Sequence, residues 1–149
     1  MLTRRQMMIG AAAALAPAER ALAKASQPST PVNFDVPAHA CDCHTHIHGD
    51  PAKFPWFAGR TYTPELALPE EMSALHKAIK MQRVVIVTPS VYGTDNSATI
   101  YGMQVRGNDA RGVAVIDEKT TEGELDKLAS LGFKGIRDRK STRLNSSHT

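Results

Sequence analysis

The amino-acid sequence predicts an α/β fold built on a parallel sheet. Short aliphatic runs, RVVIVTPS at 83–90 and RGVAVID at 111–117, are typical of strands buried on both faces of such a sheet. They alternate with segments whose apolar residues recur at helical spacing. Strands separated by amphipathic helices require right-handed crossovers between parallel neighbours. The 149 residues, of which 42% are hydrophobic, suffice for one packed domain.

The first elements are expected in a regular order. The run ACDCHTHI at 40–47 predicts a short first strand. A helix is predicted over Pro69–Met81, because this segment opens with proline and two glutamates and then repeats apolar residues at helical spacing: Met72, Leu75 and Ile79. After the strand at 83–90, Asp95 and Asn96 are expected to cap a second helix.

The last helix and strand carry their own signals. Thr121 and Glu124 have the spacing of a capping box, and Gly132 is placed to end the helix that they start. FKGIR at 133–137 begins a fourth strand. The final residues, DRKSTRLNSSHT at 138–149, have no apolar period. We expect a disordered, non-native tail whose deletion leaves stability unchanged, with a natural disordered tail as the alternative.

Residues 1–25 have the anatomy of a secretory signal peptide. Arg4 and Arg5 precede an apolar run at 7–16, and A-x-A patterns suited to cleavage follow. The paired arginines resemble a twin-arginine export signal, so we expect recognition by the export machinery and a periplasmic location in a bacterium. The apolar run is too short for a permanent membrane span, and a frayed N-terminal helix is the alternative. Residues 26–39 are predicted to be a linker.

Composition excludes some classes of partner. The net charge of +3 comes from the two ends of the chain, and aromatic residues make up only 5%. The body of the protein therefore gives no reason to expect nucleic-acid binding. The two cysteines, Cys41 and Cys43, lie two positions apart and are poorly placed to bond each other. We expect small buried side chains there rather than a disulfide.

A cluster of histidines, ACDCHTHIHGD at 40–50, is the strongest functional signal in the chain. On a strand, Asp42, His44 and His46 would share one face, and His48 follows near the end of the strand. Two imidazoles at alternate positions can converge on one metal ion or one substrate oxygen. We therefore expect a functional site here, and we expect the remaining histidines to be surface or packing residues: His39, His76 and His148.

The D-x-H-x-H element on a first strand resembles that of the amidohydrolase superfamily of metal-dependent TIM-barrel hydrolases. Further motifs, in the same order, resemble the branch that contains 2-pyrone-4,6-dicarboxylate hydrolase and related lactonases: YTPELALPEEM, VVIVTPSVYGTDN, RGVAVID and GFKGIR. The resemblance covers residues 38–137. It implies that residues 40–137 are the N-terminal half of a (β/α)8 barrel, with about four βα units, and that the parent protein is a hydrolase.

The resemblance also implies roles for particular residues. His44 and His46 are expected to be catalytic, either binding a divalent, zinc-like metal or polarising the scissile carbonyl group. Tyr62, Ser90 and Arg137 are expected to hold the carboxylates of a small substrate, a task that suits hydroxyl donors and a two-pronged guanidinium. Without the resemblance, Tyr62 could serve packing, Ser90 could cap a helix or turn, and Arg137 could be a surface charge.

A complete barrel takes about 250 residues, whereas four strands are predicted here. We therefore expect an N-terminal fragment, inactive by itself, with the general base and the remaining ligands in later strands. The implied reaction is hydrolysis of a lactone or ester in a small carboxylated ring compound. Two alternatives stay open: a metal-dependent decarboxylase of the same superfamily, and a non-catalytic exported protein that binds a metal or a ligand.

Overall fold

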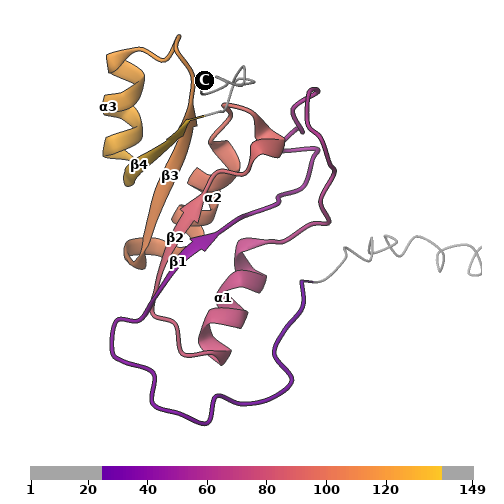
Figure 1. Ribbon diagram of the computed structural model, residues 1–149, viewed down its shortest axis with the longest axis vertical. Helices are drawn as coiled ribbons and strands as arrows, with labels where there is room; N and C mark the ends of the chain where they lie inside the picture. The colour runs from indigo at the N-terminus through magenta and orange to yellow at the C-terminus, as the bar shows by residue number, and fades with distance from the viewer. Residues whose placement is uncertain (1–24, 139–149) are drawn as a thin grey trace, which may run out of the picture.

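A computed structural model describes residues 25–138, which form a parallel sheet in the order β1-β2-β3-β4 with helices between the strands (Figure 1). The strands and helices are β1 (Cys41–Thr45), α1 (Pro69–Ala78), β2 (Arg83–Val87), α2 (Ser97–Arg106), β3 (Ala110–Ile116), α3 (Glu122–Ser130) and β4 (Phe133–Asp138), with short 3-10 helices η1 (Ser90–Tyr92) and η2 (Gly107–Asp109). This alternation confirms the predicted α/β fold class. The predicted signal peptide up to residue 24 and the predicted tail from residue 139, with His148, lie outside the described residues. The prediction that the tail starts at Asp138 is wrong by one residue, because Asp138 is the last residue of β4.

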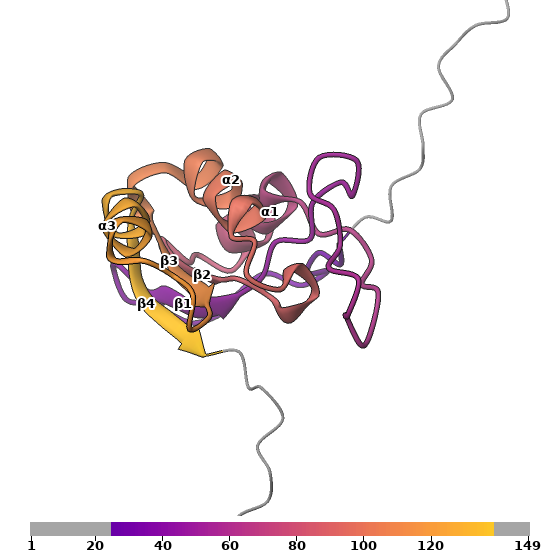
Figure 2. The same cartoon turned by 90° about the horizontal axis from the view of Figure 1, so that it is seen from above.

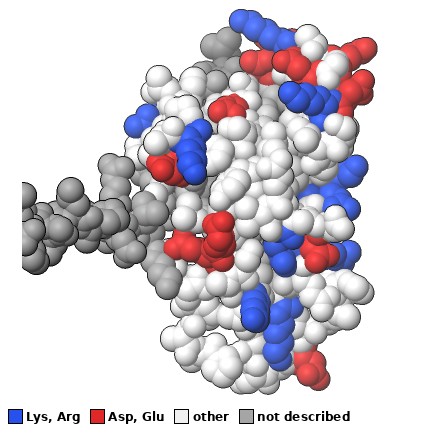
Figure 3. Space-filling model, turned by 180° about the vertical axis from the view of Figure 1, so that it is seen from behind, with Lys and Arg blue, Asp and Glu red and all other residues white. Residues whose placement is uncertain are grey.

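Helices α1, α2 and α3 cover one face of the sheet, as the view from above shows (Figure 2). Helix α2 approaches the sheet closely at Gly102, where a Cβ atom would lie 2.7 Å from Ile47 Cγ1. On the side opposite to that of Figure 1, positive and negative side chains are interspersed (Figure 3). The buried core between helices and sheet contains Ile47, Met72, Val84, Ile86, Met103, Ala110, Ala114 and Phe133.

The start and the end of helix α3 match the predicted signals, whereas the end of α1 does not. Helix α3 begins with the predicted capping box, in which Thr121 Oγ1 accepts the Glu124 N–H and the Glu124 carboxylate accepts the Thr121 N–H. Gly132 follows this helix with a φ of +101°, a conformation that glycine adopts without strain. Helix α1 ends at Ala78, earlier than predicted, because the chain turns out of the helix with Lys80 at a φ of +61°.

Asn96 does not act as the predicted helix cap. It occupies the N-cap position of α2, but its side chain makes no capping hydrogen bond. Its Oδ1 instead accepts the Val115 N–H at 2.9 Å and the Thr88 hydroxyl at 2.8 Å, and its Nδ2 donates to the Val115 carbonyl oxygen at 2.9 Å. Asp95 Oδ1 accepts the Ser97 N–H at 2.8 Å and supplies the cap. The Asn96 amide therefore fastens the end of β2 to β3.

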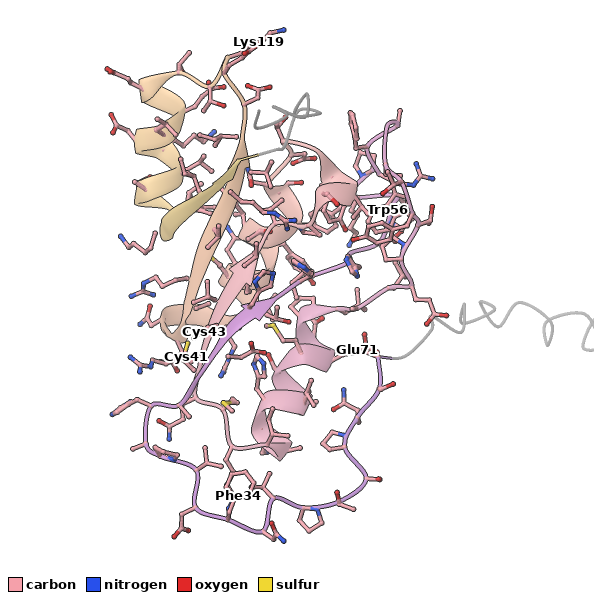
Figure 4. The ribbon with its side chains drawn as sticks, in the orientation of Figure 1. Phe34, Cys41, Cys43, Trp56, Glu71 and Lys119 are labelled. Carbon is pink, nitrogen blue, oxygen red and sulfur yellow. The ribbon has the colours of Figure 1, made fainter. Side chains whose placement is uncertain are left out.

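The predicted linker lies against helix α1, where Glu71 is labelled in Figure 4. The Gln27 side chain of the linker donates to the Glu71 carbonyl oxygen at 3.1 Å, and the N–H of Ala25, the last residue of the predicted signal peptide, donates to Glu71 Oε1 at 2.9 Å. Glu71 Oε2 also accepts the Leu68 N–H at 2.9 Å, so one glutamate connects the segment before β1 to the start of α1. None of the helices within residues 25–138 is long and apolar enough to cross a bilayer.

Candidate functional site

The predicted site residues gather at the edge of the sheet where the strands end. His44 is the residue before the last of β1, Ser90 begins η1 after β2, and Arg137 is the residue before the last of β4. The carboxyl ends of parallel strands meet at one edge, which is where ligands and catalytic groups collect in α/β folds. The topology therefore brings together residues that are far apart in the sequence.

Aromatic rings form a continuous row from β1 into the loop that follows it. The ring centroid of His44 lies 5.1 Å from that of His46, which lies 6.1 Å from that of His48. The row continues to Trp56, labelled in Figure 4, at 6.3 Å, and from Trp56 to Tyr92 at 4.9 Å. Tyr92 anchors the end of the row, because its hydroxyl oxygen accepts a backbone N–H of the loop at 2.9 Å. Burial raises the pKa of Tyr92 to about 12, so the hydroxyl stays neutral.

The ring of His46 is held in one tautomer. Its Nδ1 lies 2.7 Å from the carbonyl oxygen of Val87. A carbonyl oxygen only accepts, so Nδ1 carries the proton and Nε2 presents a lone pair. Burial lowers the pKa of His46 below its ordinary value of 6.5; the bond to Val87 opposes this, while the charges of His44 and Arg137 lower the pKa further. His46 is therefore a neutral acceptor, suited to a water proton or a metal ion.

Arg137 lies on the same face of the sheet as His46. Ala114 belongs to the core and pairs with Ile136, so Arg137, next along β4, points to the opposite face. Ile47 is fully buried in the same core, so His46 also points away from it. The effect of the Arg137 charge on the pKa of His46 agrees with this placement. The Arg137 side chain is exposed, and within residues 25–138 no hydrogen bond occupies its donors.

The other two predicted substrate-binding residues lie at the margin of this face. Ser90 is exposed at the start of η1. Tyr62 lies in the loop between β1 and α1 with 48% of its surface exposed, and within residues 25–138 no hydrogen bond or ring contact joins it to the histidines. Arg60 braces this loop by donating from Nε to Thr63 Oγ1 at 2.9 Å. The carboxylate-binding roles of Tyr62 and Ser90 stay predictions.

The prediction that Asp42 shares a face with His44 and His46 is wrong. The register between β1 and β2 shifts after Asp42, which adds one residue to β1 and reverses the alternation of its side chains. Asp42 instead turns toward α1, where its Oδ2 lies 3.0 Å from His76 Nε2. His76 is buried, as predicted for a packing residue, but its hydrogen bond to Asp42 was not predicted. Its helical spacing from the buried Met72 is the signal that places it on the inner face of α1.

His48, which the sequence places near the end of the first strand, belongs to the row of rings. Its backbone pairs with Ala67 in an isolated antiparallel bridge, with both N–H···O distances at 2.9 Å. Its Nε2 is buried and has no hydrogen-bond partner in the part of the chain that the structure describes. Burial lowers the pKa of His48, and the charge of His46 lowers it further. His48 is thus a second neutral imidazole beside His46.

The two cysteines are only partly as predicted. Both Cys41 and Cys43 are free thiols, in agreement with the expectation of no disulfide. Cys43 is exposed rather than buried, because it lies where the register of β1 shifts and β1 is an edge of the described sheet (Figure 4). Burial raises the pKa of the Cys41 thiol, so this side chain is protonated at neutral pH.

The described residues do not form a complete metal centre. His46 has the tautomer that a metal ligand needs, with its other nitrogen fixed by a backbone carbonyl. However, within residues 25–138 no group of three or more His, Cys, Asp or Glu side chains is placed to hold a metal ion. A zinc site takes at least three protein ligands. Within residues 25–138, His44 and His46 can therefore supply only part of such a ligand set.

Comparison with known proteins gives consistent matches. A family model described as amidohydrolase matches residues 41–147. The chain is 35% identical over 112 residues to 2-pyrone-4,6-dicarboxylate hydrolase of Comamonas testosteroni, covering 75% of this chain and 36% of that protein. It is 35% identical over 109 residues to 4-sulfomuconolactone hydrolase of Rhizobium radiobacter, covering 73% of this chain and 36% of that protein.

A solved structure has the same fold. It is a probable 2-pyrone-4,6-dicarboxylic acid hydrolase from Acinetobacter baumannii with citric acid bound, and it matches with a TM-score of 0.62 at 26% identity. The match covers 66% of this chain and 37% of that chain. The chain thus spans about 36% of the length of the curated relatives that it matches.

Proposed function

The chain belongs to the amidohydrolase family, and from this premise we propose that the full-length protein is a hydrolase that opens a lactone in a small carboxylated ring compound. The observation that carries the proposal is the placement of a neutral His46 and an exposed Arg137 on one face of the sheet. His46 can accept a proton or a hydrogen bond, and Arg137 can bind an anion. Relatives named as lactone-acting and dicarboxylate hydrolases support it.

The two histidines are proposed to have different roles. In lactone hydrolysis, water attacks the carbonyl carbon, the ring C–O bond breaks, and the ring oxygen leaves after gaining a proton. Since Nδ1 of His46 donates to Val87, its Nε2 is free only to accept, which lets it orient the attacking water for a general base from later strands. The exposed His44, with its ring 5.1 Å away, can direct an N–H toward the carbonyl oxygen.

The carboxylate of the substrate is proposed to bind Arg137, with Tyr62 and Ser90 as neutral donors. A guanidinium meets a carboxylate with two parallel hydrogen bonds, which fixes the orientation of the ring as well as its position. The citric acid in the Acinetobacter baumannii structure is a carboxylate-rich ligand, which supports carboxylate binding in a protein of this fold. Discrimination against uncharged lactones should follow, because Arg137 would lose its partner.

A metal and an exported location are separate parts of the proposal. Amidohydrolases are generally metal-dependent, and His44 and His46 would supply two ligands to a divalent, zinc-like ion whose other ligands come from outside residues 25–138. When bound, such an ion polarises a carbonyl oxygen. Elemental analysis of the purified protein tests the proposed metal binding.

The twin-arginine pattern favours passage through the export machinery to the periplasm.

The proposed function is tested with the full-length protein and pairs of lactones that differ only in one carboxylate. Each free acid is compared with its methyl ester, and ring opening is followed by ultraviolet absorbance and product mass. We expect hydrolysis of the free acid with kcat/KM about 10-fold or more above that of the ester, since a charge-assisted hydrogen bond contributes about 1.5–3 kcal/mol.

The same assay separates the alternatives. A decarboxylase releases carbon dioxide without a gain of water, and a binding protein binds the lactone without turnover. Either result, or equal rates for acid and ester, contradicts the proposed function.

A further inference from the structure

A single extra residue in β1 decides which way its histidines point. Asp42 pairs with Val84 of β2, and Thr45 pairs with Ile86, so β1 has one more residue than β2 between these pairs. Val84 and Ile86 both face the core. In a regular strand, His44 would occupy the position opposite Ile86 and would turn toward the helices.

The extra residue moves the histidines to the other face. After it, Ile47 points into the core with 0% of its surface exposed, whereas His46 lies on the face that also carries Arg137. A β-bulge reverses the alternation of side chains and re-aims those that follow it. The site described above therefore depends on this bulge.

The side chain of Asp42 holds both sides of the bulge. Its Oδ1 accepts the N–H of His44 at 3.1 Å, which fixes the backbone of the shifted residues. Its Oδ2 accepts a hydrogen bond from His76 Nε2 at 3.0 Å, which fixes the carboxylate to α1. The His76 side chain is 1% exposed and cannot move to an alternative partner without opening the contact between α1 and the sheet.

We propose that the Asp42–His76 pair is a positioning device that pins the bulge in β1 and thereby directs His44 and His46 into the site. The aspartate of the D-x-H-x-H element then sets the register of the strand instead of facing the substrate. The catalytic consequence rests on the proposed function, whereas the structural consequence does not.

The test uses variants of His76 and Asp42 in the full-length protein. His76→Leu fills the buried space with an apolar side chain but removes the donor to Asp42, whose side chain is 32% exposed, so that its carboxylate can still be hydrated. His76→Gln keeps an N–H donor near the position of Nε2. Asp42→Asn keeps one acceptor oxygen for the His44 N–H, but its Nδ2 can meet His76 Nε2 only if that imidazole changes tautomer and accepts. Met72→Leu, on the same buried face of α1, is the matched control.

The first readout is independent of activity. In protein labelled with 15N-histidine, we expect His76→Leu and Asp42→Asn to shift the imidazole resonances of His44 and His46. We also expect the His44 amide to exchange with solvent about 10-fold faster, because its acceptor is no longer fixed. His76→Gln should restore both signals, and Met72→Leu should leave them unchanged. Unchanged His44 and His46 resonances in His76→Leu and Asp42→Asn overturn the proposal.

The second readout is the division between kcat and KM. If the lactone is hydrolysed, His76→Leu should lower kcat about 10-fold or more with KM nearly unchanged. Misplacement of a catalytic group by about 1 Å can lower the rate by that much. His76→Gln should recover most of the lost kcat. Equal kcat values in wild type and His76→Leu overturn the positioning role. Absence of lactone hydrolysis in the wild type contradicts the proposed function alone, and the resonances of His44 and His46 still decide the inference.

Discussion

His46 Nδ1 lies 2.7 Å from the carbonyl oxygen of Val87, so the last residue of β2 fixes the ring that follows β1. This contact crosses between neighbouring strands at the edge where they end. It determines which nitrogen of His46 is free, and the free nitrogen determines whether the ring can accept or donate. The chemistry proposed for the site therefore depends on the pairing of β1 with β2.

The lowered pKa of His46 predicts how stability changes with pH. The folded state binds a proton at this residue less readily than the unfolded chain, whose ordinary value is 6.5. The contribution of His46 to the free energy of unfolding is therefore complete above about pH 6.5. It declines as the pH falls toward the lowered pKa of the folded state. His48 acts in the same direction. Urea unfolding of the full-length protein at pH 8 and pH 5 should show lower stability at pH 5.

The positive charge of Arg137 contributes to the lowered pKa of His46, and a substitution can remove this charge. We expect Arg137→Gln to raise the pKa of His46, as measured by NMR titration of its imidazole, because one of the positive charges near it is lost. The pKa should stay below 6.5, since burial is the largest cause of the shift. A pKa that does not change would place Arg137 too far from His46 to share a substrate with it.

The amide of Asn96 should matter more for stability than the neighbouring cap. Asn96→Ala leaves the Val115 N–H and carbonyl oxygen without their partners, and a buried group left unpaired costs about 1–3 kcal/mol. Asp95→Ala, the matched control, removes a cap worth about 1 kcal/mol. Chemical denaturation should show a larger loss for Asn96→Ala. Equal losses would mean that both residues act only at the start of α2.

Two helical glycines should respond in opposite ways to the same substitution. Gly102→Ala places a Cβ 2.7 Å from Ile47 Cγ1, so α2 or the core must shift and the free energy of unfolding should fall. Gly123→Ala, in α3, meets no atom within 4 Å and should gain up to about 1 kcal/mol from helix propensity. Denaturation midpoints measure both effects, and stabilisation by Gly102→Ala would contradict the packing of α2 on β1 and β2.

The order of elements could be predicted because its signals are local. The aliphatic runs of β2 and β3 and the capping box at Thr121 depend on residues a few positions apart. The row of histidines could also be recognised in the sequence, because residues at alternate positions of a strand place their rings side by side. The half-barrel assignment and the substrate-binding roles came instead from resemblance to a family, and within residues 25–138 no side-chain hydrogen bond of Tyr62 or Ser90 would have revealed them.

The errors at Asp42 and Asn96 have a common physical cause, which is contact between distant residues. Asp42 was placed on the wrong face because a one-residue bulge depends on the register with β2 and on His76, a residue 34 positions away. Asn96 fits the pattern of a cap, but its amide is used by Val115, 19 positions away. Neither His76 nor Val115 can be inferred as a partner from periodicity. Asp42 fits the alternation of a strand and Asn96 fits the pattern of a cap, but tertiary contacts override both local rules.

The prediction of export concerns residues outside the described range. Cleavage at the A-x-A patterns should give a mature protein that starts near Leu22–Ser26. N-terminal sequencing of the protein from the periplasmic fraction measures this directly, and a variant with Arg4→Lys and Arg5→Lys is expected to remain unprocessed. Intact Met1 on wild-type protein in the cytoplasm would contradict the expectation.

The most direct test of the proposed reaction compares Arg137→Lys with His44→Asn on a carboxylated lactone. A lysine keeps the charge but loses one of two parallel hydrogen bonds, so kcat/KM should fall about 10-fold to 100-fold, mainly through KM. His44→Asn should mainly lower kcat, because its N–H acts on charge that develops in the transition state. The account predicts this division between KM and kcat. An Arg137→Lys variant that equals wild type on every carboxylated lactone, or two variants that both leave kcat unchanged, would contradict it.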